Sequence, residues 1–439
     1  MLVAVEDWML MLALCAAAAL VAVGMVRPAL LVAVFVLVRP ILDYYSGSRL
    51  GGLSSANPGG ALGLLLLSAL AVLLAGARSL FQPRATWPFV ALLVVSAAAA
   101  ANSLLSLGGT IGLQPVSEIL RLAVLVAIYL LAANLFRDSK AVRNLFVMVG
   151  LSGVIPAAIG IYTWIASTAD PGEDGVVRLS GTFSGPLPFS AYLAVCALVL
   201  ISAPPRTPPG WVRLPALALI LTALVGTYSR EGWITFLLGA ALLLWRRRKA
   251  RVIALAVAAA LVIAIVPTAR ARFLPGAEPS STSGGTYSSY NWRIGNWQGL
   301  LGKAAERPFF GWGLQTTAYI NPRARFGFDR IPGSGFDAHN TAVRAVVEGG
   351  VVLLAVYVLL IATIVGRLWH IQRAEWDLRP FARTVYWIWV VLIVIALTSN
   401  DPFEQTTTMY ALLALTGSVE GAHARWLGSR PGDVIGEGR

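Results

Sequence analysis

Thirteen apolar segments, most of them close to the length of a membrane-spanning helix, follow one another along this chain of 439 residues. A helix that crosses a bilayer needs about 20 mostly apolar residues. The segments are continuous apolar runs and do not alternate in polarity, which excludes a transmembrane β-barrel. The first two segments are short and the last is weak, so the sequence predicts an all-α polytopic membrane protein with 12–13 transmembrane helices. The predicted spans lie near residues 8–26, 29–44, 61–76, 87–107, 116–136, 143–166, 186–203, 212–228, 231–245, 251–267, 345–366, 382–400 and 405–420.

The composition supports the same fold class and excludes others. Hydrophobic residues make up 57% of the chain and charged residues only 13%, against about 25% charged in an ordinary soluble domain. A soluble globular protein, a disordered chain and a disulfide scaffold are therefore ruled out. The two cysteines, Cys15 and Cys196, sit inside apolar runs, and the chain has only three histidines. We expect no disulfide framework, no metal site and no nucleic-acid partner; the partner that the composition predicts is the lipid bilayer.

Basic residues predict how the chain is oriented in the membrane, because cytoplasmic loops are rich in Lys and Arg. The strongest basic block, Arg246–Lys249 with Arg251, should be cytoplasmic. Alternating the spans from there places 20 of the 34 basic residues inside and 14 outside, nine of them in one long segment. We therefore expect an inner-membrane protein with residues 268–344 on the extracytoplasmic side.

This topology divides the chain into four parts. Residues 1–267 form a transmembrane bundle with the first ten spans, 268–344 an extracytoplasmic catalytic loop, 345–420 the last two or three spans, and 421–439 a cytoplasmic tail. Long loops in compact proteins usually carry function. This one begins with a Gly/Ser/Pro-rich stretch that should be flexible, from Pro275 to Thr286.

An amphipathic helix is predicted inside the long loop, from Tyr290 to Glu306. Its apolar positions recur at helical spacing, and Pro308 should end it. The residues of this apolar stripe are Tyr290, Ile294, Trp297 and Leu301.

The long loop is basic, although the positive-inside rule predicts few basic residues there. It contains four acidic residues and nine basic ones: Arg270, Arg272, Arg293, Lys303, Arg307, Arg323, Arg325, Arg330 and Arg344. One interpretation is attraction to lipid headgroups. The other is an anionic ligand on the outer side, because Arg recognises phosphate oxygens in a bidentate manner. Arg121, Arg178 and Arg230 add to the outer positive charge.

Two of these outer arginines have an acidic neighbour that could explain them. Arg230 precedes Glu231 between two spans, so it could be a turn charge near headgroups, paired with that carboxylate. Arg121 lies one turn into its span with Glu118 three residues before it, which favours an intrahelical ion pair. Charge inside a membrane is nevertheless costly and points to function.

His339 is the one histidine on the predicted outer side, where a helix should begin. Asp337 is the expected N-cap, and the helix N-terminus would favour a bound anion. The same positive end disfavours imidazolium and would leave a neutral His able to accept a proton. Asn340, Arg344 and Glu348 follow at i+4 spacing and form one polar stripe. The alternative is a His and Arg pair that packs at headgroup level.

Several motifs with known chemistry are absent from the sequence. There is no Walker-type phosphate loop, dinucleotide fingerprint, G-x-S-x-G or H-E-x-x-H motif. Paired external carboxylates at short spacing that would suggest an Mg²⁺ or Mn²⁺ site are also missing, which leaves Asp43 and Asp401 near the outer surface as the acidic candidates. We therefore expect neither a cofactor nor a metal.

Three stretches together resemble the bacterial O-antigen ligase and polymerase family. Residues 226–233, with Ser229-Arg230 and Trp233, resemble the family's Ser-Arg-Gly-x-Trp element. Residues 293–313 are similar to its Arg-x3-Trp helix followed by a Pro-Leu-x-Gly-x-Gly turn.

The third stretch is similar to the family's pattern of His-Asn/Ser, nine residues, Gly, two residues and Gly. His339, Asn340 and Gly350 match it, but Leu353 stands where the second Gly is expected. This departure should affect helix packing more than chemistry. Arg178, with residues 181–186 after it, also resembles the family's loop before a middle span.

The resemblance implies a C-type glycosyltransferase-like fold with one large extracytoplasmic loop that contains short helices. It implies an inverting, metal-independent transfer of glycan from an undecaprenyl-diphosphate donor to a saccharide acceptor. Arg293, Arg230 and Arg178 would bind the donor diphosphate, with Arg344 a weaker candidate, and His339 would be the catalytic base.

Two classes of function follow from the sequence. The first is this glycosyltransferase, a surface-polysaccharide polymerase or O-antigen ligase whose active site faces the extracytoplasmic side. The second is a transporter or flippase for a polyprenyl-linked glycan or another anion, which would explain the many spans and the outer arginines. It would not explain the long outer segment with its helix and single His.

Overall fold

The structure is a computed structural model in which part of the chain is described. The described residues are 27–47, 63, 66–71, 74, 81–166, 177–204, 208–245, 249–250, 253, 257, 289–322, 338–397 and 406–429. The predicted span 8–26, the Gly/Ser/Pro-rich stretch from Pro275 to Thr286 and the basic residues Arg246–Arg248 lie outside them.

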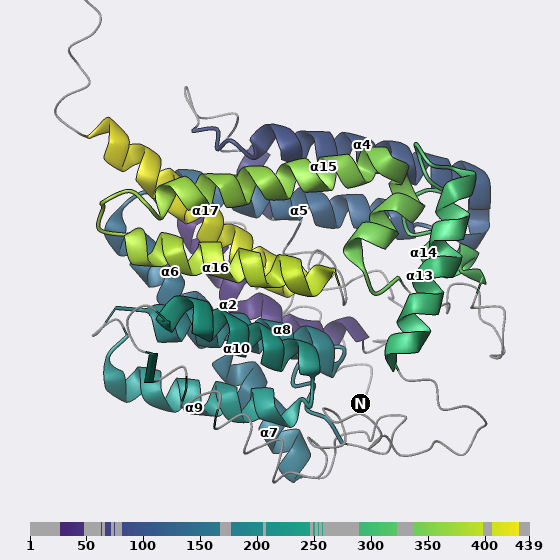
Figure 1. Ribbon diagram of the computed structural model, residues 1–439. Coiled ribbons are helices and arrows are strands. Elements are labelled where there is room, and N and C mark those ends of the chain that lie inside the picture. Colours follow the sequence, from purple (N-terminus) through teal and green to yellow (C-terminus); the bar gives the residue numbers. More distant parts are fainter. Residues whose placement is uncertain are drawn as a thin grey trace, which may run out of the picture.

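The described part of the chain is helical and contains no strand, which confirms the all-α fold class (Figure 1). A short 3₁₀ turn, Gly108–Thr110, follows the helix that ends at Leu107. The α-helices are α2 (Pro28–Gly47), α4 (Thr86–Leu107), α5 (Gln114–Leu135), α6 (Ser139–Ser152), α7 (Val154–Ile165), α8 (Pro186–Ser202), α9 (Gly210–Gly226), α10 (Arg230–Leu244), α13 (Ser289–Glu306), α14 (Thr317–Ile320), α15 (Thr341–Ile371), α16 (Arg379–Ala396) and α17 (Thr406–Gly428).

Five segments of the described chain are long and apolar enough to cross a membrane. They are α4, α5, the pair α6–α7, α15 and α16, and three shorter apolar helices accompany them: Pro28–Leu42 within α2, α8 and α9. The predicted single span 143–166 is divided at Gly153 into α6 and α7. A Cβ atom at Gly153 would lie 3.1 Å from the Cys196 sulfur, so the small residue lets α8 approach this joint closely.

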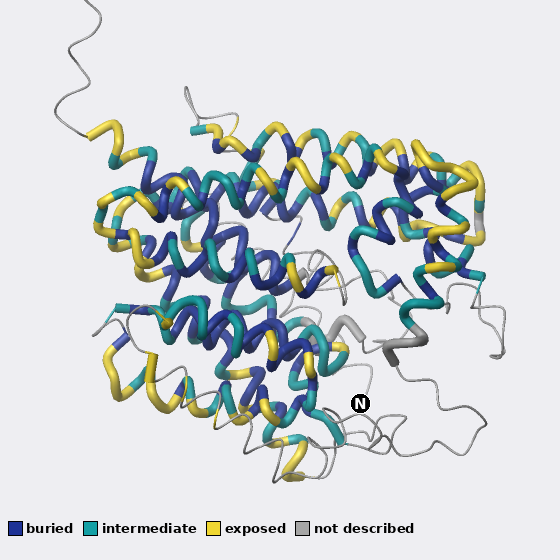
Figure 2. Tube along the Cα trace, viewed as in Figure 1, coloured by how far each residue is buried: buried dark blue, intermediate teal, exposed yellow. Residues whose placement is uncertain are grey.

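Helix α8 forms the centre of the bundle. Every side chain from Phe189 to Leu200 is buried, and the helix packs against α6, α9, α10 and α16. A helix that is apolar all round is stable only when other helices surround it. Figure 2 shows this buried interior running along the length of the bundle.

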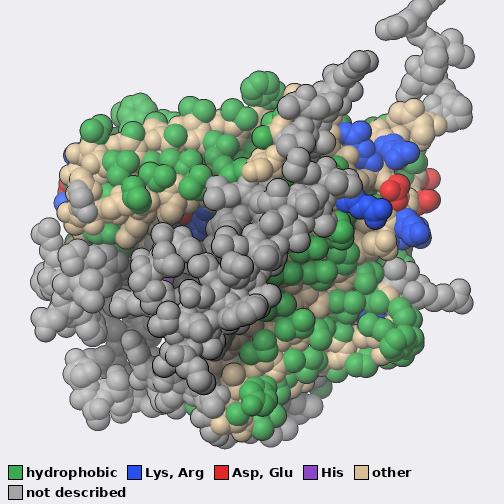
Figure 3. Space-filling model, turned by 180° about the vertical axis from the view of Figure 1, so that it is seen from behind, with side chains coloured by type: hydrophobic (Ala, Val, Ile, Leu, Met, Phe, Trp, Pro, Cys, Tyr) green, Lys and Arg blue, Asp and Glu red, His purple; other side chains and the backbone are tan. Residues whose placement is uncertain are grey.

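The outer helices, in contrast, bury little of their apolar surface in the protein. Of the 18 most apolar consecutive residues in each helix, only 28% are buried in α4 and in α15, against 61% in α5. Large apolar side chains such as Trp87 and Leu105 on α4 remain exposed. Apolar surface of this extent needs lipid to cover it, and Figure 3 shows such surface on the rear face of the molecule.

Close backbone contact joins α17 to α5. A Cβ atom at Gly421 would lie 1.9 Å from the Ala133 carbonyl oxygen, and one at Gly417 would lie 2.3 Å from the Tyr129 carbonyl oxygen. Small residues four apart are a recurring device for packing helices within membranes. This contact continues past the predicted end of the last span at residue 420, because α17 runs to Gly428 with Gly421 and His423 still buried.

The two ends of the bundle differ. On the rear face, charged side chains gather at one end of the molecule, where α17 finishes (Figure 3). At the opposite end, α13 lies across the ends of the long helices, beside α14 and the beginning of α15 (Figure 1). Two of the segments that the sequence singled out, α13 and the beginning of α15, therefore lie together at this second end.

Candidate functional site

A backbone hydrogen bond brings the loop of Arg178 to the start of α10. The Leu179 N–H donates to the carbonyl oxygen of Gly226, the last residue of α9, over 3.1 Å. A Cβ atom at Gly226 would lie 2.8 Å from the Leu179 side chain, so glycine makes room for this contact. Arg178 therefore lies beside the turn that leads from α9 to Arg230.

The N-terminus of α10 fixes the backbone of Arg230. Ser229 is the N-cap: its Oγ accepts the Gly232 N–H over 3.3 Å and the Ser190 hydroxyl of α8 over 2.9 Å. A Cβ atom at Gly232 would lie 2.3 Å from the Ser190 Cβ, so only glycine allows α8 and α10 to pack this closely. The first residue of α10, Arg230, is thus held where the loop before α8 meets the end of α9.

Electrostatic interactions connect Arg178, Arg230 and Arg293. Burial lowers the pKa of the Arg178 guanidinium from its usual range, and the nearby charge of Arg230 lowers it further. For Arg293, burial lowers the pKa, the carboxylate of Glu231 raises it, and the charge of Arg230 lowers it. Arginine stays protonated in proteins, so these shifts report crowded, partly desolvated cations. Arg230 thus lies near enough to act on both other arginines that the sequence proposed as donor ligands, and Glu231 acts on Arg293.

Helix α13 carries Arg293 and contacts the segment before α15. The prediction of a helix from Tyr290 to Glu306 is confirmed, but its buried side is not the predicted one. Leu301 is 47% exposed, whereas Leu300 is buried. The predicted stripe was wrong at Leu301 because α13 turns the neighbouring residue toward α15, where Leu300 packs with Val347.

A single side chain joins α13 to the predicted base. The indole Nε1 of Trp297, one turn after Arg293, donates to the carbonyl oxygen of Ala338 over 2.8 Å. Ala338 directly precedes His339. The helix that carries Arg293 is thus tied to the backbone beside His339.

The beginning of α15 confirms where His339 was expected to lie, but not the residue that caps the helix. Asn340 is the N-cap, and its Oδ1 accepts the N–H groups of Ala342 and Val343. Asp337, the predicted cap, lies outside the described residues; the side chain nearer to the helix performs this role. The Asn340 Nδ2 donates to the Leu397 carbonyl oxygen over 2.8 Å, which fixes the cap against the end of α16.

The backbone of His339 adopts the left-handed region, with φ of 49°. The described residues contain two other non-glycine residues with positive φ, Tyr228 and Gln315. Such conformations are uncommon and concentrate at functional sites. Tyr228 precedes the arginine at the start of α10, so two of the three residues adjoin predicted site elements.

Arg344, the weaker donor candidate, is buried in an ion pair. Its Nε lies 3.1 Å from Oε1 of Glu348, one turn further along α15, and the same oxygen accepts the Thr317 hydroxyl over 2.8 Å. Arg344 is 8% exposed and Glu348 only 2%. Two of the three residues of the predicted polar stripe, Arg344 and Glu348, therefore face the protein interior, where their charges pair.

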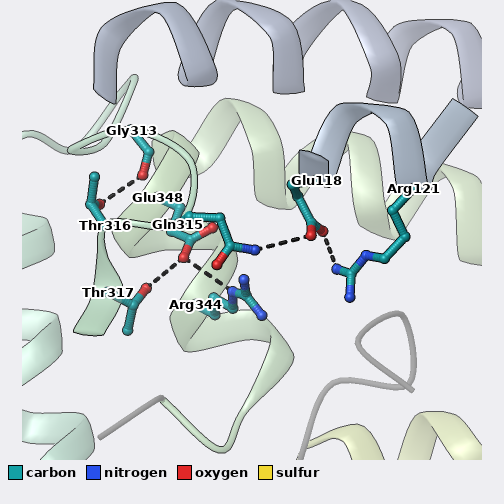
Figure 4. A network of polar contacts seen from close by, with 8 residues as sticks. All are labelled: Glu118, Arg121, Gly313, Gln315, Thr316, Thr317, Arg344 and Glu348. Atoms are coloured by element: carbon teal, nitrogen blue, oxygen red, sulfur yellow. Dashed lines mark hydrogen bonds and ion pairs between the residues drawn. The ribbon is translucent and has the colours of Figure 1, made fainter. Parts of the chain in front are cut away.

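A second ion pair, predicted within α5, belongs to the same region (Figure 4). Glu118 Oε1 pairs with the terminal nitrogen of Arg121, which confirms the intrahelical pair. The other carboxylate oxygen accepts the Gln315 side-chain amide over 3.0 Å. The segment from Gln315 to Thr317 thus bonds to a carboxylate of α5 through Gln315 and to one of α15 through Thr317. We call these two neighbouring groups of contacts the polar network.

The segment 308–313 enters a break in α15. Gly350 has φ of 67° and ψ of −165°, which interrupts the helix. The N–H groups of Trp312 and Gly313 donate to the carbonyl oxygens of Val347 and Glu348, each over 2.8 Å. The Val351 N–H donates to the Pro308 carbonyl oxygen over 2.8 Å. The inserted segment therefore replaces the hydrogen bonds that the broken helix lacks.

Replacing Gly350 with alanine should destabilise the protein. Its backbone region is nearly restricted to glycine and costs another residue about 1–3 kcal/mol, and a Cβ atom would lie 2.2 Å from the Phe309 carbonyl group. We expect a lower melting temperature and reduced activity. Gly366→Ala in the same helix is the matched control, because a Cβ there meets nothing within 4 Å. Equal melting temperatures for the two variants would contradict the role assigned to the break.

Sequence reasoning missed the partners of the predicted residues. Glu231 was considered only as a partner of Arg230, yet its charge also acts on Arg293. Gln315 and Thr317 were not singled out, and no pattern in the sequence marks them. Within the described residues, no three His, Cys, Asp or Glu side chains lie close enough together to hold a metal ion.

Comparison with known families gives one match. Residues 215–358, about a third of the chain, match the model of the O-antigen ligase family. Neither a curated protein nor a solved structure matches the chain. The matched region begins in α9 and contains Arg230, Arg293, His339, Arg344 and the break in α15.

The match agrees with the architecture around it. Several apolar helices long enough to span a bilayer make the chain a multi-pass membrane protein, and the matched domain is that of a membrane enzyme that transfers glycans. Residues 215–358 therefore carry a domain similar to that of the O-antigen ligase family.

Proposed function

We propose that this protein is an extracytoplasmic glycosyltransferase that joins a glycan from an undecaprenyl-diphosphate donor to a hydroxyl group of an acceptor saccharide. One arrangement supports the proposal. The loop of Arg178 is bonded to the end of α9 beside Arg230, the charge of Arg230 acts on both Arg178 and Arg293, and the helix of Arg293 is tied to the backbone beside His339. Cations for the diphosphate and an imidazole for the hydroxyl proton are groups suited to such a transfer.

The arginine cluster, defined as Arg178, Arg230 and Arg293, would hold the donor diphosphate. When the bond between the sugar and the diphosphate breaks, negative charge develops on the leaving group. Preorganised cations in a partly desolvated site stabilise that charge more strongly than water does. Among the described residues, three positive charges and the carboxylate of Glu231 leave the cluster cationic, which suits a dianionic group. Arg344 remains a weaker candidate, because its Nε is bound to Glu348.

His339 would accept the proton of the acceptor hydroxyl. The hydroxyl oxygen attacks the anomeric carbon from the side opposite the diphosphate, the bond to the diphosphate breaks, and the proton passes to the imidazole. The anomeric configuration is thereby inverted. A positioned general base contributes roughly 10²–10⁴-fold to a rate, and the hydrogen bond from Trp297 to Ala338 supports a fixed position for this residue.

The proposal places no metal and no cofactor in the reaction. The charge stabilisation that Mg²⁺ gives to diphosphate leaving groups in many enzymes would come from the arginine cluster instead. Catalysis in excess EDTA tests this part of the proposal separately.

The proposed location is the extracytoplasmic face of the bacterial inner membrane. Two observations support it: the site lies at one end of the bundle, and charged side chains gather at the other end on the rear face (Figures 1 and 3). The acceptor is a second repeat unit if the protein is a polymerase and a different saccharide if it is a ligase. The same chemistry serves both.

A transporter for a polyprenyl-linked glycan is the alternative, and the break in α15 is the observation that favours it. Broken helices line the substrate sites of many transporters. Here the backbone of residues 308–313 occupies the break, and hydrogen bonds from Trp312 and Gly313 satisfy its carbonyl groups. This arrangement supports an enzyme more than a transport pathway.

Turnover in vitro separates the two functions. Purified protein in detergent, given lipid-linked repeat units as donor and acceptor, should produce longer glycans, and excess EDTA should not abolish the reaction. A transporter would leave the glycans unchanged. Unchanged glycans from protein with an intact melting transition would therefore refute the enzyme.

A further inference from the structure

The polar network of Figure 4 is distinct from the arginine cluster. It consists of Glu118 and Arg121 on α5, Gln315 and Thr317 between α13 and α15, and the pair Arg344 and Glu348 on α15. Two carboxylates and two guanidinium groups balance each other, whereas the arginine cluster has an excess of positive charge. A balanced set of donors and acceptors is suited to neutral hydroxyl groups, and an excess of cations is suited to phosphate.

The network also contains groups that a ligand can reach. The Arg121 side chain is 21% exposed, against 9% for its partner Glu118. Gln315 is half-buried, and its amide nitrogen is held by Glu118. In Figure 4 the guanidinium groups of Arg121 and Arg344 approach from opposite helices, α5 and α15. Donor groups anchored from behind by carboxylates are a common basis for recognising sugars.

The backbone around Gln315 is held rigidly. The following residue, Thr316, is buried, and its hydroxyl donates to the Gly313 carbonyl oxygen over 2.7 Å. The preceding residue, Leu314, donates its N–H to the Ala99 carbonyl oxygen of α4 over 3.0 Å. Gln315 itself has φ of 63°. Residues other than glycine rarely adopt this left-handed conformation, and those that do cluster at functional sites.

The network is connected to the predicted base through α15. Arg344 and Glu348 lie one and two turns from the Asn340 cap, which corresponds to about 6 and 12 Å along a helix. His339 adjoins that cap, and the Arg344 N–H bonds to the Asn340 carbonyl oxygen. A saccharide bound to the network would therefore lie near the group that accepts its proton.

We propose that this network is the subsite for the acceptor saccharide. Arg121 and Gln315 donate hydrogen bonds to its hydroxyl groups, and Glu118 holds both side chains in place. Glu348 and Thr317 fix Arg344 at the junction with the catalytic end of α15. The inference rests on the proposed function and adds to it a division of the site: phosphate recognition on one side and neutral saccharide recognition on the other.

Binding of two separate probes tests the inference. The first probe is undecaprenyl diphosphate, and the second is oligosaccharide released by mild acid from the surface polysaccharide of the source cells. Glu118→Gln should weaken oligosaccharide binding about tenfold or more, because a charge-assisted contact is lost, and should leave undecaprenyl diphosphate binding unchanged. Gln315→Asn should do the same, since asparagine tolerates the left-handed backbone but is too short to reach Glu118.

The matched control is Glu306→Gln. It removes the carboxylate of another i, i+3 ion pair, that of Lys303 and Glu306, which is exposed on α13, and it should change neither affinity. Melting curves identify a variant that does not fold. If Glu118→Gln fails to fold, Arg121→Lys at a partly exposed position tests the same contact and should lose oligosaccharide affinity.

The outcomes separate this inference from the proposed function. Wild-type oligosaccharide affinity in the folded Glu118 and Gln315 variants would overturn the acceptor subsite alone. So would a loss of undecaprenyl diphosphate affinity in them, which would make the network a second phosphate site. A wild-type protein that binds neither probe would overturn both the subsite and the proposed function.

Discussion

Replacing His339 with alanine should lower turnover by roughly 10²–10⁴-fold, the usual contribution of a positioned general base. Binding of undecaprenyl diphosphate should change much less, because in the proposed site the arginine cluster, and not His339, holds the diphosphate. The measurement is a pair of assays on one preparation: the rate of glycan joining at saturating donor, and the affinity for undecaprenyl diphosphate.

Two further variants distinguish the effect of losing the imidazole from the effect of straining the backbone at His339. His339 has a left-handed backbone, which alanine adopts less readily than asparagine. His339→Asn keeps this backbone and should be as slow as His339→Ala. His339→Gln keeps the size and a hydrogen-bonding group, and nearly full activity in this variant would contradict a base and indicate a packing residue. A loss of donor binding in the alanine variant would instead make His339 a ligand of the diphosphate.

Replacing Arg293 with alanine should reduce donor use about tenfold or more, because one charge-assisted contact contributes ~1.5–3 kcal/mol. Arg293→Lys should not restore it fully, since a point charge cannot replace the bidentate guanidinium. Donor concentration curves measure the effect, which should appear as weaker undecaprenyl diphosphate binding.

Arg307→Lys is the matched control for this prediction. Arg307 is also an arginine of the long loop, but it stacks on the Trp312 ring at 4.1 Å, and its replacement should leave donor use near the wild-type level. If alanine at Arg178, Arg230 and Arg293 in turn left donor binding and turnover normal, the arginine cluster would not be the diphosphate site.

Local patterns in the sequence were sufficient for several features of the site. The helical spacing from Tyr290 to Glu306 predicted α13, and the i, i+3 spacing of Glu118 and Arg121 predicted their ion pair. The polar residues before a long apolar run predicted the beginning of α15. Each of these features depends on residues less than about five turns apart in one helix, so the neighbouring sequence determines it.

Features that depend on distant segments could not be predicted. The Arg178 loop reaches Arg230 through the bond from Leu179 to Gly226, and no spacing rule relates those positions. The N-cap of α15 is Asn340 and not the predicted Asp337. Both residue types are good N-caps and both precede the same helix, so residue type alone could not distinguish them. The position of the first helical N–H groups, which bond to Asn340, decides which of the two residues is the cap.

In the matched region, the contact between the turn of Gly311 and Gly313 and the break at Gly350 is another feature that the sequence could not predict. The resemblance attached a turn to Gly311 and Gly313 and a separate pattern to Gly350. Only the fold shows that they are one device, in which the backbone of the turn fills the break in α15. The missing second glycine, at Leu353, is compatible with this: Leu353 is buried, and its side chain packs against Gly349.

The central claim is that this protein breaks the bond between the glycan and undecaprenyl diphosphate as it forms a new glycosidic bond. The most direct measurement counts both products in one reaction of the purified protein, undecaprenyl diphosphate by mass spectrometry and new glycosidic bonds by analysis of the glycan. The proposed reaction predicts one undecaprenyl diphosphate released for each bond formed. Release without a new bond, or longer glycan without release, would contradict it.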